Sequence, residues 1–96
     1  MYLDLIFKIA NYIEKHYPEP SITMGKQKFY KRSAECFALN KAIVKCLDNP
    51  DEYPTYIFDD LILSYILASK ESVQTENKYL YLTFINALTD VREHFS

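Results

Sequence analysis

The chain has 96 residues, of which 49% are apolar, 16% aromatic and 25% charged, enough for one domain with a buried core and too apolar for a disordered chain. One glycine and four prolines exclude collagen-like and glycine-loop architectures and leave too few turn residues for a many-stranded sandwich or barrel. The net charge of −2 argues against a general binder of polyanions.

The first predicted element is a helix over about Tyr2–His16. Its apolar residues recur at three- and four-residue steps from Leu3 to Tyr17, which is the spacing of one helical face. Pro18 ends this helix. The following stretch, Pro18–Gly25, holds two prolines and the only glycine and is predicted to be a loop.

The second predicted element is a helix over about Lys26–Leu47 with two contrasting sides. Helical spacing places larger side chains on its buried side, flanked by Phe37 and Val44. The buried set comprises Phe29, Cys36, Leu39, Ile43 and Leu47. The opposite side is expected to face solvent as a stripe of lysines and small residues, made up of Lys31, Ala34, Ala38, Lys41 and Lys45.

The third predicted element is a helix over about Thr55–Ser69, after the acidic, turn-rich connector Asp48–Pro54. This helix is apolar around most of its circumference, which predicts that it is the central helix of the fold. Asp59 and Asp60 are expected at its solvent edge. Adjacent residues on a helix diverge by about 100°, so these two carboxylates cannot flank one substrate bond as a paired acid and base.

The fourth predicted element is a helix from Thr75 to near Ser96. Tyr79–Ile85 has the residue content of a strand, but the three- and four-residue spacing continues through it to Phe95 and favours a helix. Four helices with short connectors predict an all-α, antiparallel four-helix bundle over residues 1–96, in which helices adjacent in sequence pack together. We expect a monomer or a weak dimer.

The sequence carries no motif for catalysis or for a metal. One glycine cannot build a phosphate-binding loop or a nucleophile elbow, and neither cysteine has a histidine nearby in sequence. His16, Cys36, Cys46 and His94 lack the short spacings that preform half of a zinc site. We therefore expect no enzymatic activity, no cofactor and no metal.

The cysteines and the apolar runs bear on the cellular compartment. Cys36 and Cys46 are separated by about 15 Å of axial rise on one helix, more than the roughly 7 Å that a disulfide spans, so both are expected as reduced thiols. No apolar run approaches the roughly 20 residues of a membrane span, and no signal-peptide pattern is present. These features predict a cytoplasmic protein without a transmembrane segment.

The charges are unevenly distributed. Six cations and one acid lie within Ser21–Leu47, which leaves five cations and twelve acids elsewhere, or +5 against −7. Lys26–Arg32 interleaves basic and aromatic residues, a composition that suits phosphate contacts and base stacking as well as the solvated start of an amphipathic helix. One hypothesis is a small regulatory binding module, of phage or mobile-element type. It would use Lys31, Lys41 and Lys45 on nucleic acid or on an acidic protein, and the −7 elsewhere disfavours nucleic acid.

Nine tyrosines without a tryptophan offer amphipathic side chains for a contact surface. Four of them, Tyr30, Tyr53, Tyr56 and Tyr79, either form a shared partner-facing patch or each cover a loop junction.

A second hypothesis comes from a family resemblance carried by Lys45–Ile57, by Leu61 and Ile62, and by Phe84–Val91. In these stretches a helix ends in an acidic turn, a proline opens the next helix, and the last helix has a Leu/Ile-rich pattern. From the second helix onward the chain resembles the immunity proteins of class II bacteriocins, in particular the lactococcin A and enterocin A types.

The resemblance implies a small cytosolic four-helix bundle that protects a producer cell against its own pore-forming peptide and catalyses no reaction. Members act at the inner face of the membrane, where they engage the mannose phosphotransferase permease once the bacteriocin has bound it. Many members have a specificity-setting tail after the fourth helix, whereas this sequence stops at Ser96. Recognition is therefore expected at the connector Lys70–Asn77 and at Arg92–Phe95, through Lys70, Asn77, Arg92, His94 and Phe95.

Overall fold

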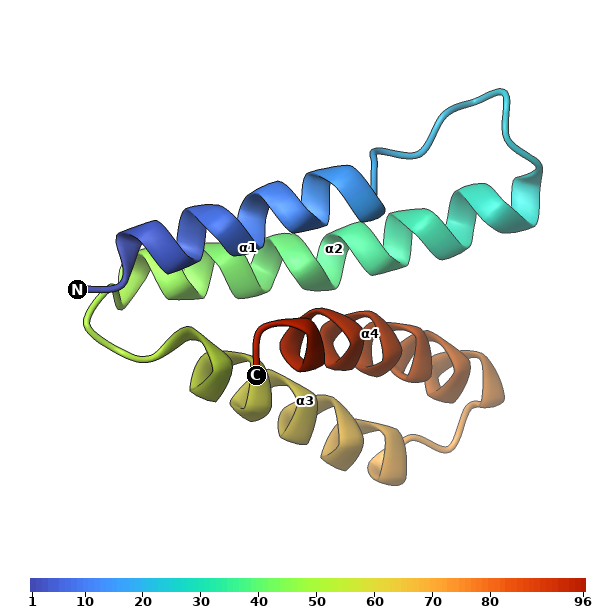
Figure 1. Ribbon diagram of the computed structural model, residues 1–96. Helices are drawn as coiled ribbons and strands as arrows, with labels where there is room; N and C mark the ends of the chain where they lie inside the picture. The colour runs from blue at the N-terminus through green and yellow to red at the C-terminus, as the bar shows by residue number, and fades with distance from the viewer.

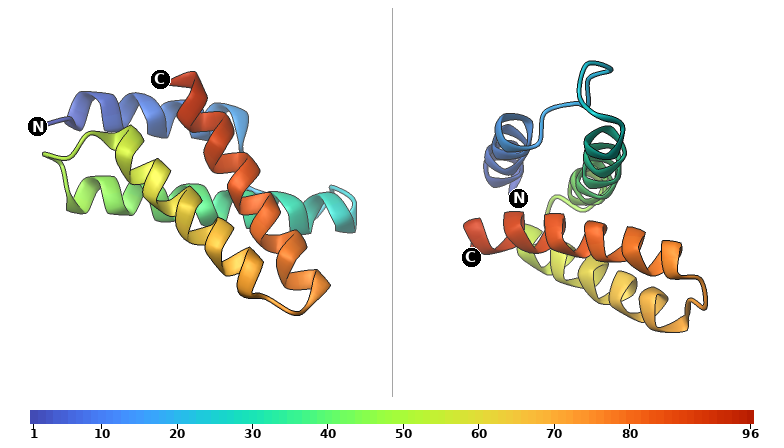
Figure 2. Two further views of the ribbon diagram at one scale, coloured as in Figure 1. Left: turned by 90° about the horizontal axis from the view of Figure 1, so that it is seen from below. Right: turned by 90° about the vertical axis from the view of Figure 1, so that its right-hand side faces the viewer.

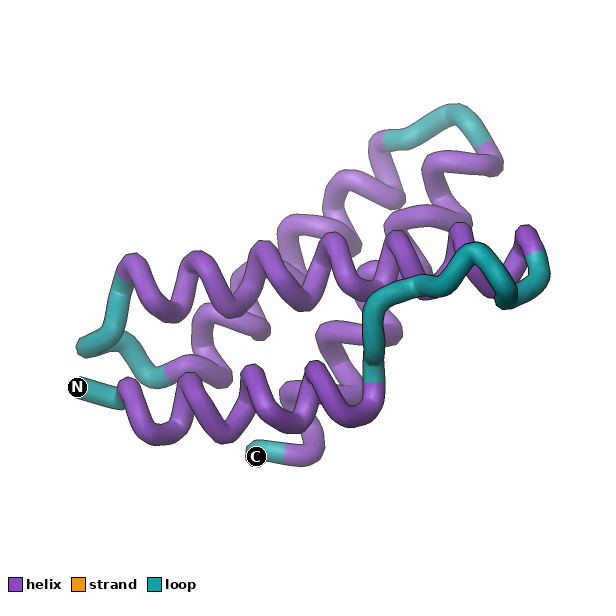
Figure 3. Tube along the Cα trace, turned by 90° about the horizontal axis from the view of Figure 1, so that it is seen from above, coloured by secondary structure: helices purple, strands orange, loops and turns teal.

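A computed structural model describes all residues, 1–96, and contains four α-helices and no strand (Figures 1 and 3). The helices are α1 (Leu3–His16), α2 (Lys26–Asp48), α3 (Pro54–Glu71) and α4 (Thr75–His94). The predicted helices are confirmed in number and order, and each end lies within two residues of its prediction. The stretch with strand-like composition forms part of α4.

The helices form two antiparallel hairpins, α1/α2 and α3/α4, which pack in two layers (Figure 1). The views of Figure 2 show that the α3/α4 hairpin crosses the α1/α2 hairpin obliquely. The shortest dimension of the molecule is 20 Å, which matches two helices of roughly 10 Å diameter each. The predicted antiparallel four-helix bundle is confirmed, with this oblique crossing between its hairpins.

Fifteen buried apolar residues from all four helices form one core. The faces predicted for α1 and α4 point into it, since Ile6, Ile9 and Ile13 are buried on α1, and Leu88 and Val91 are buried on α4. These positions follow the helical period along one stripe of each helix, so the pattern alone places them.

The predicted buried face of α2 is wrong in part. Ala38, expected at the surface, is completely buried, whereas Phe37 and Val44 are 57% and 56% exposed. The buried residues of this helix are Ala38, Leu39, Ala42 and Cys46. The physical reason is that α2 packs against both α1 and α4, and small alanines let the α4 backbone approach closely where large side chains would hold it away.

The prediction that α3 is the central helix is also wrong. Leu63 and Leu67 on α3 are more than half exposed, and the most extensive contact between the two layers is that of α2 with α4. The oblique crossing brings α4 over α2 and leaves one apolar side of α3 at the surface. The rule that helices adjacent in sequence pack together therefore misses the α2–α4 contact.

The ends of the connectors are fixed by specific contacts. The backbone N–H of Tyr2 donates to the carbonyl oxygen of Pro50 at 2.7 Å, which ties the chain start to the α2–α3 connector. Pro54 is buried at the first position of α3, where its missing N–H and fixed φ suit the helix.

None of the four helices combines the length and the apolar character that crossing a bilayer requires.

Candidate functional site

The three lysines predicted to face solvent on α2 are exposed, and they lie along the border of α2 with the α3/α4 hairpin. The Lys41 ammonium lies 5.7 Å from the centroid of the Tyr65 ring on α3, a cation–π distance. Lys45 lines a small surface pocket with Asp60, and Lys31 lies near the other end of α2, where α2 faces α4. All three lysines remain exposed, so a partner on this border would contact α2 together with α3 or α4.

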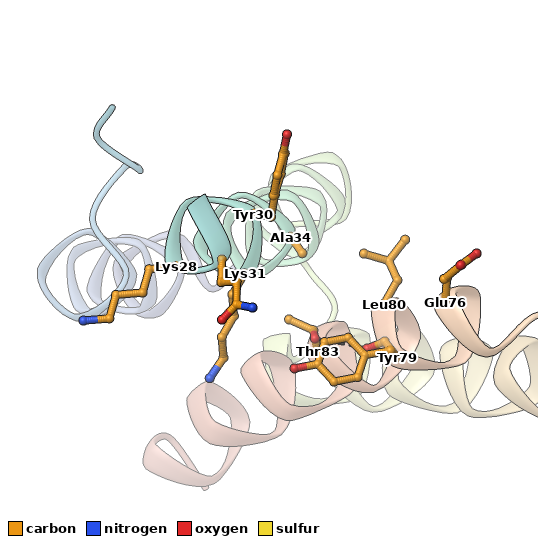
Figure 4. Close-up of a pocket in the computed structure, with 9 residues that line it drawn as sticks. Lys28, Tyr30, Lys31, Ala34, Glu76, Tyr79, Leu80 and Thr83 are labelled. Atoms are coloured by element: carbon orange, nitrogen blue, oxygen red, sulfur yellow. Dashed lines mark hydrogen bonds between the residues drawn. The ribbon is translucent and has the colours of Figure 1, made fainter. Parts of the chain in front are cut away.

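A groove of about 560 Å³ lies between the N-terminal halves of α2 and α4 (Figure 4). We call it the α2/α4 groove. Its lining includes Lys28, Tyr30, Lys31 and Ala34 from α2, and Glu76, Tyr79 and Leu80 from α4. In Figure 4 the side chains of Lys31 and Tyr79 lie toward one mouth of the groove, and those of Tyr30 and Leu80 toward the other. Its volume falls within the range of ligand pockets, roughly 300–1,000 Å³.

The α2 wall of this groove is positive. Lys28 lies in the first turn of α2, a turn that has no acidic residue and no side-chain cap. The free N–H groups of a helix start carry a partial positive charge, so this charge adds to that of the lysines. The α4 wall contributes one acid, Glu76, and is otherwise made of uncharged side chains.

Lys70 and Asn77 flank the turn between α3 and α4. Lys70 is exposed in the last turn of α3. The Asn77 side-chain amide donates to Gln74 Oε1 at 3.2 Å, so it orders this turn locally. Asn77 and His94 lie on the same helix but are about 25 Å apart along its axis, so the residues predicted from the resemblance do not form one surface.

The end of α4 is held by contacts within the molecule. Arg92 pairs with Asp59 on α3, whose side chain lies at the solvent edge as expected and also forms this ion pair. The ring centroids of His94 and Tyr12 are 4.1 Å apart in a stacked arrangement, and the Phe95 ring meets Tyr12 edge-on at 5.5 Å. These contacts fix the helix end to α1 and α3, and the His94 ring stays exposed at the rim.

Tyr17 contacts residues of both α2 and α4, which the sequence alone does not reveal. Its hydroxyl donates to Asp90 Oδ2 at 2.7 Å and so links the end of α1 to α4. The Arg32 guanidinium lies 5.7 Å from the Tyr17 ring centroid, and the Cys36 thiol donates to the Tyr17 carbonyl oxygen at 3.4 Å. Burial, followed by the hydrogen bond to Asp90, raises the pKa of the Tyr17 phenol above its usual range.

Both cysteines are free thiols, as predicted. Burial raises the pKa of Cys36, and it raises the pKa of Cys46 to about 11. A raised thiol pKa lowers the thiolate fraction at neutral pH and therefore the nucleophilicity of the sulfur.

His16 and His94 both pack against the Tyr12 ring. No group of three or more His, Cys, Asp or Glu side chains is placed to hold a metal ion.

The four tyrosines proposed as a patch fall into two groups. Tyr53 contacts Tyr2 and Tyr56 through edge-on ring pairs at 5.3 and 5.5 Å, next to the α2–α3 connector. Tyr30 and Tyr79 lie in the α2/α4 groove. The single patch is therefore wrong, and one pair covers a loop junction while the other lines a groove.

The sequence singled out Lys31 and Tyr79 separately, and the fold brings both into the same groove. Leu80 and Glu76 were missed because they lie beside the apolar face of α4 that packs into the core.

In comparisons with known proteins, no family model, no curated protein and no solved structure matches the chain.

Proposed function

We propose that this protein acts by binding another protein, as a bacteriocin-immunity protein. In this proposal it engages the complex of a pore-forming peptide with the mannose phosphotransferase permease from the cytoplasmic side of the membrane. It then blocks the pore without catalysing a reaction.

The observation that carries this proposal is the arrangement around the start of α3. An acidic turn closes α2, and Pro54 occupies the first position of α3 within a bundle of four helices, which is the architecture that the resemblance implies. The surfaces assigned to recognition are the turn with Lys70 and Asn77 and the helix end with Arg92, His94 and Phe95. Since these two surfaces lie at opposite ends of α4, the proposal assigns them to separate contacts.

A protection assay tests this proposal. The protein is expressed in sensitive lactic acid bacteria, which are then challenged with a panel of class II bacteriocins. We expect survival against at least one member, and we expect Lys70→Glu to reduce it while the matched charge reversal Lys8→Glu on α1 leaves it unchanged. Failure to neutralise any member of the panel, with the protein present and folded in the cells, contradicts the proposal.

A second candidate function is a small regulatory binding module that uses the basic border of α2 on nucleic acid or on an acidic protein. It is favoured by Lys31 and Lys45, which line hollows between the two hairpins, and by Lys41, whose ammonium lies over the Tyr65 ring. All three lysines are exposed. Reversing these three charges is expected to abolish binding of this kind and to leave bacteriocin protection largely intact. Circular dichroism of the variant checks the fold, since Lys41 also contacts the Tyr65 ring.

A further inference from the structure

The α2/α4 groove opens because the two helices diverge from a close crossing. At the crossing, Ala38 and Ala87 are almost completely buried, and such small side chains allow the helices to approach closely. Toward the start of each helix the two backbones separate, as Figure 2 shows for α4 and α2. The groove occupies the space between these diverging halves.

The groove leaves apolar surface open to solvent. Tyr30 and Tyr79 are 61% and 68% exposed, and Leu80 is 41% exposed. Tyrosine and leucine side chains in a concave site bind apolar anchors, and tyrosine hydroxyls at the rim add hydrogen bonds. The occupant therefore needs one or two large apolar side chains.

The charges around the groove select an acidic occupant. Lys28 and Lys31 belong to its α2 wall, and they lie within the stretch that carries +5 while the rest of the chain carries −7. Figure 4 shows the Lys28 side chain at the outer edge of the α2 wall, pointing away from Tyr79, so an acidic segment along this wall meets Lys31, then Lys28 at its edge, and the positive start of the helix. Glu76 on the α4 wall repels an acid on that side, so the acidic residues of the occupant have to follow α2.

The same charges favour a peptide over a nucleic acid. A nucleic acid strand carries a charge at every phosphate and extends beyond a groove of about 560 Å³, toward the acidic remainder of the protein. A helical peptide keeps its acids on one side and its apolar anchors on another, which matches one positive wall and a mostly uncharged one.

We propose that the α2/α4 groove binds an acidic amphipathic helix of another protein, with its acidic side on Lys28 and Lys31 and its apolar anchors on Tyr79 and Leu80. This inference rests on the second candidate function, which it narrows to one class of partner, and is independent of the immunity proposal.

Fluorescence anisotropy of the whole protein with synthetic probes tests the inference. The first probe is a labelled peptide of about 18 residues, or five helical turns, with leucine and phenylalanine at helical spacing and glutamate beside them. The second probe replaces each glutamate with lysine, and the third is a single-stranded DNA of about 20 nucleotides. We expect saturable binding of the acidic peptide, weakened by salt, and no comparable binding of the other two.

Variants locate the binding and separate it from folding. Lys28→Glu with Lys31→Glu is expected to raise the Kd of the acidic peptide by about tenfold or more, and Glu76→Lys to lower it several-fold. Lys28→Glu places an acid in the first turn of α2, which favours the helix, whereas Lys31→Glu lies four residues from Glu35 and disfavours it, so circular dichroism of the double variant separates loss of binding from unfolding. The matched reversal Lys8→Glu with Lys15→Glu on α1 is expected to leave the Kd unchanged within about twofold.

Each remaining result overturns the inference. Equal binding of the lysine peptide would show that charge does not select the partner. An unchanged Kd in the Lys28→Glu, Lys31→Glu variant would show that the peptide binds outside the groove. Tighter binding of the DNA than of the acidic peptide refutes the peptide partner while leaving the second candidate function standing. Absence of binding by both the acidic peptide and the DNA removes the inference together with that function.

Discussion

The Arg92 guanidinium donates two hydrogen bonds to the Asp59 carboxylate, from Nε to Oδ1 at 2.9 Å and from Nη2 to Oδ2 at 3.3 Å. This pair joins the end of α4 to the first turns of α3. Because the guanidinium is held in a paired geometry, a partner that uses Arg92 has to compete with Asp59 for it.

We expect Arg92→Ala and Asp59→Ala each to lower the urea midpoint slightly at low salt. Both side chains are partly exposed, so the attraction between them is screened and the effect is smaller than that of a core replacement. The double variant is expected to lose less than the sum of the single losses. If the losses are additive, or if they persist undiminished at high salt, the pair does not contribute through its charges.

The Tyr65 hydroxyl is buried and has no hydrogen-bond partner. Replacing Tyr65 with phenylalanine removes this unpaired group, so we expect the free energy of unfolding to stay unchanged or to rise by up to about 1 kcal/mol. Tyr17→Phe is the comparison, because it deletes the hydrogen bond to Asp90 and is expected to cost about 1 kcal/mol. Urea unfolding measures both. A clear loss of stability in Tyr65→Phe would show that its hydroxyl is paired in solution.

Ala38 lies completely buried where α2 packs against α4. Ala38→Leu adds volume to a packed contact and is expected to lower the free energy of unfolding by about 1–3 kcal/mol. Asn40→Leu, at an exposed position of the same helix, is expected to change it by less than about 0.5 kcal/mol. A neutral Ala38→Leu would instead support the outward-facing alanine stripe predicted from the sequence.

Burial of Cys46 makes stability depend on alkaline pH. Its pKa is raised from 9.0 to about 11, so the folded state holds the thiol proton after the unfolded chain has lost it. This contribution to the free energy of unfolding is complete below about pH 9 and declines as the pH rises toward about 11, by up to about 3 kcal/mol. Urea unfolding at about pH 8 and about pH 10.5 is expected to show a smaller decline for Cys46→Ala than for the wild type. Parallel declines would mean that the thiol stays equally accessible in both states.

The helices were predictable because their signals are local. Pro18, Gly25 and Pro54 mark helix boundaries, and the apolar period assigns the inward faces of α1 and α4. The inward face of α2 was not predictable in the same way. Its larger side chains and its alanines both repeat with a helical period, and only the position of α4 decides which set is buried.

The candidate site was predictable only in its parts. The basic residues of α2 and the exposed Tyr79 can be read from the sequence, but their meeting in one groove depends on the angle between the hairpins. The pairing of Arg92 with Asp59 likewise joins residues 33 positions apart. A periodic pattern within one helix does not indicate which residue of another helix will pair with it.

The division into two hairpins has a consequence for how the chain folds. Contacts within α1/α2 and within α3/α4 join residues close in sequence, so each half can form early at a small cost in loop-closure entropy. The α2–α4 contact and the link from Tyr17 to Asp90 span long stretches of chain and have to be made afterwards. We expect the rate-limiting barrier to lie at the docking of the two preformed halves.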